Sequence, residues 1–223
     1  MKHPMQCVSP RLAAFCLVVS TIAGGAHVLQ AQTAPRRSAP VDLGVLEAPD
    51  RDAWQMPERI MDALSIGDNS VVADVGAGAG WFTVRLSARV GPGGRVYAQD
   101  VQPEMLAAIE RRVQGQGRRN VRTVLGTPID PRLPSGAMDA ILLVDAYREL
   151  TDAPALLRRL ATALKPNGRL AIIDFHPGEG GPGPDATERM APARIEADAA
   201  RAGLTLDRIE TFLPFQYVLI FRR

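Results

Sequence analysis

The stretch that decides the fold is Val71-Val72-Ala73-Asp74-Val75-Gly76-Ala77-Gly78-Ala79-Gly80. Its apolar first half predicts a buried strand, the alternating glycines predict a tight turn, and the residues from Trp81 onward predict a helix. Glycine has no Cβ, so the backbone of such a turn can pass close beneath a ligand. The N–H groups at the start of the following helix favour a negatively charged group. The pattern indicates a cofactor-binding loop, with an ordinary strand-to-helix turn as the alternative.

A second acidic residue, Asp100, supports the interpretation as a cofactor-binding loop over that as an ordinary turn. Asp100 ends the strand-like stretch Arg95–Asp100 and follows Gly80 by twenty positions. A carboxylate at this place can accept hydrogen bonds from both hydroxyls of an adenosine ribose, whether in NAD or in S-adenosylmethionine (SAM). The glycine spacing G-A-G-A-G differs from the G-x-G-x-x-G of a dinucleotide fingerprint. The spacing therefore argues against NAD.

The remaining pattern alternates strands and helices, which predicts a parallel sheet with helices on both faces. A first helix begins at Pro57, and the last helix, Pro192 to Ala202, precedes two tightly joined and therefore antiparallel β segments, Leu206–Phe212 and Gln216–Phe221. The loop 126–137 can reach roughly 40 Å, and the crossover needs only roughly 15 Å, so the strand order 3-2-1-4 requires no helix there. We expect strands near 70–74, 95–100, 121–125, 138–144 and 169–174, and helices near 81–90, 103–114 and 153–164.

The segment DVGAGAGWFTVRLSARVGPGGRVYAQDVQPEML (74–106) resembles the first two cofactor motifs of class I SAM-dependent methyltransferases. The resemblance runs from about Trp54 to Arg223 and recurs in AMDAILLV (137–144), LLRRL (156–160), LKPNGRLAIID (164–174) and LPFQYVLIF (213–221). It implies an α/β fold with a single Rossmann-like doubly wound sheet of strand order 3-2-1-4-5-7-6, in which the last strand is antiparallel.

The resemblance also implies SAM as the cofactor and assigns its contacts. The acid and glycines of the first motif would line the methionine end, Asp100 would hold the ribose, and its neighbours would flank the adenine. Relatives often carry an acid after the glycine that follows the third strand, whereas Thr127 follows Gly126 here and offers only its hydroxyl to the adenine amine. The expected cofactor-binding residues are Asp74, Gly76, Gly78, Gly80, Gln99, Asp100, Val101 and Thr127.

Methyl transfer needs mainly an in-line approach of the acceptor, because the sulfonium already activates the methyl group. A base is optional, and candidates lie where the fourth and fifth strands end. The candidate catalytic residues are Asp145, Tyr147 and His176, with Arg148 and Asp174 beside them. A helix cap is the alternative role for Asp145, and an exposed loop position is the alternative for His176. Ahead of the first helix, Arg51, Trp54 and Gln55 suit either a lid over the cofactor or simple packing of Trp54.

The beginning of the chain has the pattern of a signal peptide, residues 1–31. Lys2 and Arg11 precede the uncharged run Leu12–Ala26, and Ala31 is a small residue at a cleavage position. The run is short for a membrane anchor, which needs about 20 apolar residues. We therefore expect a flexible leader at 32–50, a methyltransferase domain at 51–223 and a periplasmic or secreted enzyme without a stable membrane anchor. A misassigned start and a cytoplasmic enzyme are the alternative.

Removal of that segment changes the charge and thiol content. Of the 26 basic residues, 24 remain, against 24 acidic ones, so the formal net charge is zero and no nucleic-acid partner is indicated. Cys7 and Cys16 are both removed, which excludes disulfides, cysteine metal sites and a cysteine nucleophile. Some similar methyltransferases act on arsenite and hold the metalloid with cysteine thiols, so the lack of thiols argues against that activity. No metal site is predicted.

The sequence favours methyl transfer to a small-molecule acceptor. One alternative is a catalytically inactive SAM- or nucleoside-binding protein that acts as a sensor or interaction module. A nicotinamide-dependent oxidoreductase is disfavoured by the glycine spacing and by the lack of a Tyr-x-x-x-Lys pair. The acceptor and the oligomeric state stay open.

Overall fold

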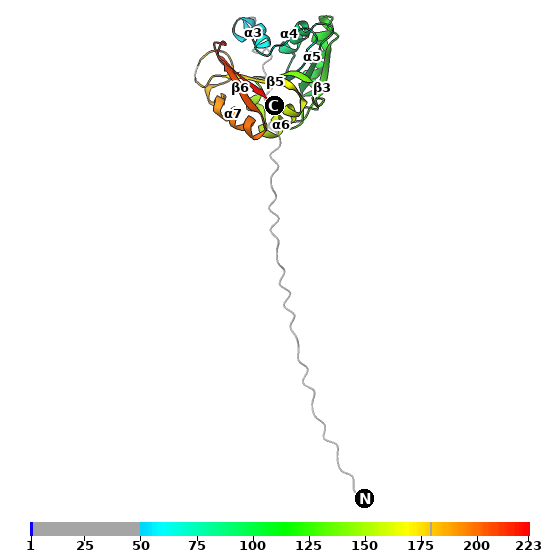
Figure 1. The fold of residues 1–223 in the computed structure, drawn as a ribbon, viewed down its shortest axis with the longest axis vertical. Helices are drawn as coiled ribbons and strands as arrows, with labels where there is room; N and C mark the ends of the chain where they lie inside the picture. Colours follow the sequence, from blue (N-terminus) through cyan, green and yellow to red (C-terminus); the bar gives the residue numbers. More distant parts are fainter. Residues whose placement is uncertain (2–49, 179) are drawn as a thin grey trace. The chain divides into compact units, whose positions relative to one another are not determined.

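The computed structural model describes Met1, residues 50–178 and residues 180–223 (Figure 1). Apart from Met1, the predicted signal peptide lies outside these residues, and so does the predicted leader up to residue 49. Within the described residues, no helix has the length and apolar character needed to cross a membrane.

The strands of this part of the chain form one mixed sheet in the order β3-β2-β1-β4-β5-β7-β6. β1 to β5 pair in parallel, and β7 is antiparallel to both of its neighbours. The predicted order and the antiparallel strand are confirmed. The strands are β1 (Val71–Val75), β2 (Arg95–Asp100), β3 (Val121–Leu125), β4 (Met138–Val144), β5 (Leu164–Phe175), β6 (Thr205–Glu210) and β7 (Gln216–Arg222).

The predicted helices are confirmed to within one residue, and most carry proline in their first turn, where its missing N–H costs nothing. One short helix, α2, lies where the sequence indicated only a lid or packing segment. The helices are α2 (Arg51–Gln55), α3 (Pro57–Ala63), α4 (Trp81–Val90), α5 (Pro103–Gly115), α6 (Ala153–Ala163) and α7 (Pro192–Arg201), with 3-10 turns η1 (Tyr147–Glu149) and η2 (Ala186–Glu188).

Two strand boundaries differ from the prediction by more than one residue. β5 begins at Leu164, five residues early, because Leu164 pairs with Met138 across a register shift in β4. α6 stops at Ala163, directly before the sequence LKPNG (164–168). β6 ends at Glu210 rather than Phe212. The loop 126–137 contains no helix and is closed only by an isolated bridge between Thr127 and Asp130.

Alternate residues of the strands build two cores. Ala73 and Val75 of β1 join the core under α6 and α7, whereas Val72 joins the core under α3 and α4. A third cluster packs α5 against β2 and α4. Figure 1 shows α3, α4 and α5 on one side of the sheet and α6 and α7 on the other. This arrangement leaves the carboxyl ends of β1, β2, β4 and β5 together at one edge.

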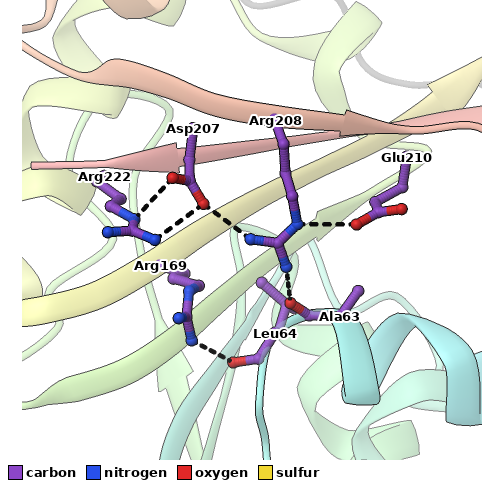
Figure 2. A network of polar contacts seen from close by, with 7 residues as sticks. All are labelled: Ala63, Leu64, Arg169, Asp207, Arg208, Glu210 and Arg222. Carbon is purple, nitrogen blue, oxygen red and sulfur yellow. Dashed lines mark hydrogen bonds and ion pairs between the residues drawn. The ribbon is translucent and has the colours of Figure 1, made fainter.

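An arginine cluster fastens α3 to the opposite, amino-terminal edge (Figure 2). Arg208 of β6 donates to the carbonyl of Ala63 at the end of α3, to Glu210 (2.8 Å) and to Asp207 (2.8 Å). Arg222 donates to the same Asp207 at 3.1 Å. A cation against the last carbonyls of a helix is favourable, so the cluster holds α3 in place ahead of β1.

Candidate active site

The glycine loop after β1 makes the sharp turn that the sequence predicts. Gly76, Gly78 and Gly80 have φ angles of +69°, +53° and +83°, a region that other residues rarely adopt. A Cβ on Gly76 would lie 2.8 Å from the Cβ of Ala146, and one on Gly80 would lie 3.0 Å from Cγ1 of Ile109. At these two positions the neighbours that exclude a side chain therefore belong to the protein, whereas the sequence argument invoked a ligand.

Asp74 fastens the loop to the following helix. Its side chain is buried and its Oδ2 accepts a 2.6 Å hydrogen bond from the hydroxyl of Thr83 in α4. Burial raises the pKa of Asp74 to about 6, and the Thr83 hydrogen bond and the charge of Arg51 partly oppose this rise. This contact fixes the start of α4 relative to the end of β1.

Asp100 lies at the carboxyl end of β2 and reaches across to the loop. Its Oδ2 accepts a 3.0 Å hydrogen bond from the backbone N–H of Gly78, and its Oδ1 accepts one of 2.9 Å from the N–H of Gln102. Burial raises the pKa of Asp100, and these N–H groups counteract the rise. The N–H of Val101 also acts on this carboxylate. A carboxylate has about four acceptor positions, so Asp100 retains capacity for a further donor.

Three further predicted residues lie at the ends of β2 and β3. Gln99 is buried, and its backbone carbonyl accepts a 3.0 Å hydrogen bond from the backbone N–H of Ala77. Gly126 provides space for the Gln99 amide, since a Cβ there would lie 2.2 Å from Nε2. The Thr127 hydroxyl accepts from the N–H of Asp130 at 3.0 Å, so it is already engaged within its own loop. Val101 is 46% exposed and presents an apolar surface beside Asp100.

Asp145 follows β4 in the left-handed region, with φ +57°. Its N–H donates to the carbonyl of Ile173 at 2.9 Å, which joins the ends of β4 and β5. Its carboxylate accepts from Gln216, and Nη2 of Arg51 lies 3.6 Å away. Burial raises the pKa of Asp145 to about 7, with Arg51 opposing and Asp174 reinforcing the rise. A carboxyl group with such a pKa can exchange protons near neutral pH.

Tyr147 and Arg148 line a cavity of about 380 Å³ between η1, α6 and α7. The Tyr147 hydroxyl donates to Asp198 of α7 at 2.6 Å, and burial together with Asp198 raises its pKa. Asp198 also pairs with Arg194 and Arg201. The Tyr147 hydroxyl is therefore already engaged by Asp198, and its predicted catalytic role stays a prediction.

His176 and Asp174 lie at the end of β5. The N–H of His176 donates to the carbonyl of Phe215 at 3.0 Å, and its ring lies 5.7 Å from that of Tyr217. The Asp174 side chain is fully buried, and its Oδ2 has no hydrogen-bond partner among the described residues. Burial raises the pKa of Asp174. These groups share the sheet edge with Asp145, as the sequence predicts.

Aromatic side chains cover the end of β5 and the start of β7. The Trp54 ring lies 6.0 Å from that of Phe175 and 6.4 Å from that of Phe215, so α2 packs here. A Cβ on Gly181 or Gly183 would lie within 2.6 Å of the Phe215 or Phe175 ring, respectively. The glycine-rich loop after His176 therefore rests directly on these rings.

The sequence argument missed Gln216 and the role of α2. Gln55 donates to Gln216 at 2.6 Å, and Arg51 donates to Gln55 at 2.8 Å. The Arg51 guanidinium also lies 4.2 Å from the centroid of Trp81, the first residue of α4. No local motif could reveal these contacts. Elsewhere in the described ranges, no three histidine, cysteine, aspartate or glutamate side chains are grouped as a metal site.

The part of the chain that contains the glycine loop and Asp100 is similar in sequence to known methyltransferases. Residues 72–168 match the methyltransferase domain family. The chain is 30% identical over 142 residues to nocamycin O-methyltransferase of Saccharothrix syringae, covering 62% of this chain and 48% of that protein. It is 34% identical over 104 residues to 2-phytyl-1,4-naphtoquinone methyltransferase of Trichormus variabilis, covering 46% and 45%. The chain thus spans about half the length of these curated relatives.

A solved methyltransferase structure extends the likeness to the whole fold. The crystal structure of a SAM-dependent methyltransferase from Aquifex aeolicus superimposes with a TM-score of 0.78 at 28% identity. The match covers 83% of this chain and 98% of that one. The methyltransferase domain match at 72–168 is thus accompanied by a likeness of fold over most of the chain.

Proposed function

We propose that this chain is a SAM-dependent methyltransferase that acts on a small-molecule acceptor. The observation that carries the proposal is the hydrogen bond between the Gly78 N–H and the Asp100 carboxylate, which places a buried acid against a bare glycine turn. The methyltransferase domain match supports it, because residues 72–168 include both Gly78 and Asp100, and the likeness to the Aquifex aeolicus structure supports the fold.

The residues present fit SAM. The N–H groups at the start of α4 are suited to the methionine carboxylate, and Arg51, next to Trp81, adds a positive charge there. Asp100 would accept from the ribose hydroxyls, while Val101 and Gln99 would flank the adenine. When bound, SAM supplies a methyl group that its sulfonium charge already activates. The protein then has to orient the acceptor and exclude water.

Acceptor-side chemistry would fall to the residues at the ends of β4 and β5. Asp145 is suited to take a proton from a hydroxyl, amine or activated carbon, because its pKa of about 7 lies near neutral pH. His176 is the other candidate base, and Asp174 lies beside it in the chain. The relatives are named as nocamycin and 2-phytyl-1,4-naphtoquinone methyltransferases, which favours a small organic acceptor here.

Calorimetry with SAM, S-adenosylhomocysteine (SAH) and NAD tests the cofactor assignment. Binding of SAM and SAH without NAD is the expected result. Turnover is tested separately, by SAH formation from SAM in the presence of a small-molecule fraction of a cell extract. Binding without SAH formation in any fraction would favour the alternative, a SAM-binding sensor.

We also propose that residues 1–31 direct export and are removed. The basic start, the uncharged run and Ala31 support this, although SAM is made in the cytosol and would have to reach the exported enzyme. Mass spectrometry of the native N-terminus after cell fractionation tests the idea. A chain that begins near Gln32 in the periplasm is expected, and one that begins at Met1 in the cytosol would contradict export.

A further inference from the structure

Four polar side chains form a closed ring at the carboxyl edge of the sheet. Nε of Arg51 donates to Oε1 of Gln55 (2.8 Å), Nε2 of Gln55 donates to Oε1 of Gln216 (2.6 Å), and Nε2 of Gln216 donates to Oδ1 of Asp145. The ring closes where Nη2 of Arg51 lies 3.6 Å from Oδ2 of Asp145. It joins α2, the end of β4 and the start of β7.

The hydrogen bonds of the ring are all oriented in the same sense. Each glutamine accepts through its oxygen and donates through its nitrogen, so the hydrogen bonds run from the cation at Arg51 to the carboxylate at Asp145. Gln55 and Gln216 are completely buried. Hydrogen bonds in such a chain polarise one another in a low-dielectric interior. The ring therefore fixes the orientation of Asp145 and favours its ionised form.

The ring borders the proposed cofactor loop. Ala146, the residue after Asp145, packs so closely on Gly76 that a Cβ there would lie 2.8 Å from it. Arg51 lies 4.2 Å from the Trp81 ring at the start of α4, and its charge acts on both Asp74 and Asp145. The carboxylate at the end of the ring is thus next to the turn that would carry the methyl donor.

Anchoring of α2 alone does not account for this arrangement. Burial of a charged pair with two amides adds little net stability, and apolar side chains of similar volume would hold a short helix at least as well. The Trp54 contacts with Phe175 and Phe215 already provide such packing. The ring instead supplies an oriented, partly exposed carboxylate at the edge where the acceptor would bind.

We propose that Arg51, Gln55 and Gln216 are positioning residues that aim the Asp145 carboxylate at the methyl acceptor, so that α2 completes the catalytic site. This inference rests on the proposed function. In the step it serves, the acceptor atom forms a bond to the methyl carbon and the carbon–sulfur bond breaks, with its electron pair staying on sulfur. The proton of the acceptor passes to Asp145 and later to water. Asp145 is the catalytic residue in this scheme.

The two tryptophans of the chain provide the readout, because both Trp54 and Trp81 lie near the Arg51 guanidinium, at 6.0 and 4.2 Å. Protonation of Asp145 changes the charge beside Arg51, so tryptophan fluorescence of the full chain should titrate with pH. Asp174, Arg148 and Arg51 are the charged groups that act on Asp145. Asp74 also acts on Arg51, so the assignment is made in an Asp74→Asn background, where Asp145→Asn should abolish the transition that remains.

Gln216→Leu removes the donor to Asp145 at nearly equal volume, and Gln55→Met interrupts the ring one residue further away. Each should move the fluorescence midpoint upward, by about half a pH unit or more for Gln216→Leu, since the carboxylate loses a stabilising hydrogen bond. SAM affinity should stay within about threefold, as no cofactor contact is removed. The pH profile of SAH formation should shift in the same direction. Gln114→Leu, at an exposed position of α5, is the matched control and should change none of these.

The two proposals fail in different ways. Wild-type protein that shows the fluorescence transition but no heat with SAM or SAH would contradict the proposed function. Wild-type protein that binds SAM, but whose midpoint is the same in folded Gln216→Leu and Gln55→Met, would overturn the positioning role. A transition that survives Asp145→Asn in the Asp74→Asn background would overturn it as well, and circular dichroism establishes that each variant is folded.

Discussion

The carboxylate of Asp100 accepts a 3.0 Å hydrogen bond from the backbone N–H of Gly78. This contact joins the end of β2 to the glycine loop after β1, so the two elements that would hold SAM support each other before any ligand binds. Because the acid is buried and its pKa is raised, it is retained at a cost to stability. Such a cost is expected of a binding residue.

Asp100→Asn should therefore separate binding from folding. The amide keeps one acceptor oxygen but has no charge, so SAM affinity should fall by about 10- to 100-fold, as for hydrogen bonds to charged groups. The melting temperature without ligand should change little, because removal of the buried charge offsets the loss of one acceptor oxygen for the Gly78 and Gln102 N–H groups. Calorimetry and thermal unfolding measure the two effects. An Asp100→Asn protein that unfolds earlier yet binds SAM normally would show that the acid serves the fold.

Gly76→Ala should destabilise the protein through the loop itself. Its φ of +69° costs an alanine roughly 1–2 kcal/mol, and the added Cβ would meet Ala146 at 2.8 Å. A fall of several degrees in melting temperature is expected. Ala146→Gly in the same chain should recover the steric part only.

Gly67→Ala is the matched control for that substitution. Nothing lies within 4 Å of a Cβ at Gly67, and its φ is outside the left-handed region. We expect almost no change in stability. Equal losses for Gly67→Ala and Gly76→Ala would contradict the packing of Ala146 on the loop.

Asp74 should make folding depend on pH in an identifiable window. Its folded pKa of about 6 is higher than its unfolded value of 3.8, so the folded state binds more protons between pH 4 and pH 6. The free energy of unfolding therefore falls as pH rises through this window. Asp74→Asn keeps an acceptor for Thr83 and should remove that loss.

Urea unfolding at pH 4.5 and pH 7.5 measures the effect. The difference in unfolding free energy between Asp74→Asn and wild type should favour the variant more at pH 7.5 than at pH 4.5. The same difference between the two proteins at both pH values would mean that Asp74 does not titrate in this window.

Tyr147→Phe should distinguish a structural from a catalytic tyrosine. The hydroxyl donates to Asp198 at 2.6 Å, so its removal should cost about 1–2 kcal/mol of unfolding free energy. The loss is limited because Asp198 keeps Arg194 and Arg201. SAH formation, once an acceptor fraction is found, should be nearly unchanged. A large loss of turnover at normal stability would instead indicate that Tyr147 is a catalytic residue.

The fold and the cofactor loop could be predicted from sequence because their signals are local. Apolar runs, glycines and prolines mark each strand and helix within a few residues, and Asp100 is recognisable by its distance from Gly80. Where the prediction needed distant neighbours, it fell short. The reason for glycine at position 76 lies in Ala146, and the Tyr147 hydroxyl is engaged by Asp198, 51 residues away.

The positioning ring shows the same limit most clearly. Gln216 lies in a strand pattern that reads only as β7, yet its partners Gln55 and Asp145 are 161 and 71 residues away in the chain. A buried glutamine in a strand carries no periodic or motif signal. Only the sheet order, which brings the start of β7 to the ends of β4 and β5, places it beside the acid.

Calorimetric titration of the purified, folded chain with SAH tests the central claim most directly, because SAH occupies the cofactor site without reacting. We expect saturable one-to-one binding in wild type that Asp100→Asn weakens by at least about tenfold. A folded wild-type protein that gives no heat with SAH or with SAM would contradict the account.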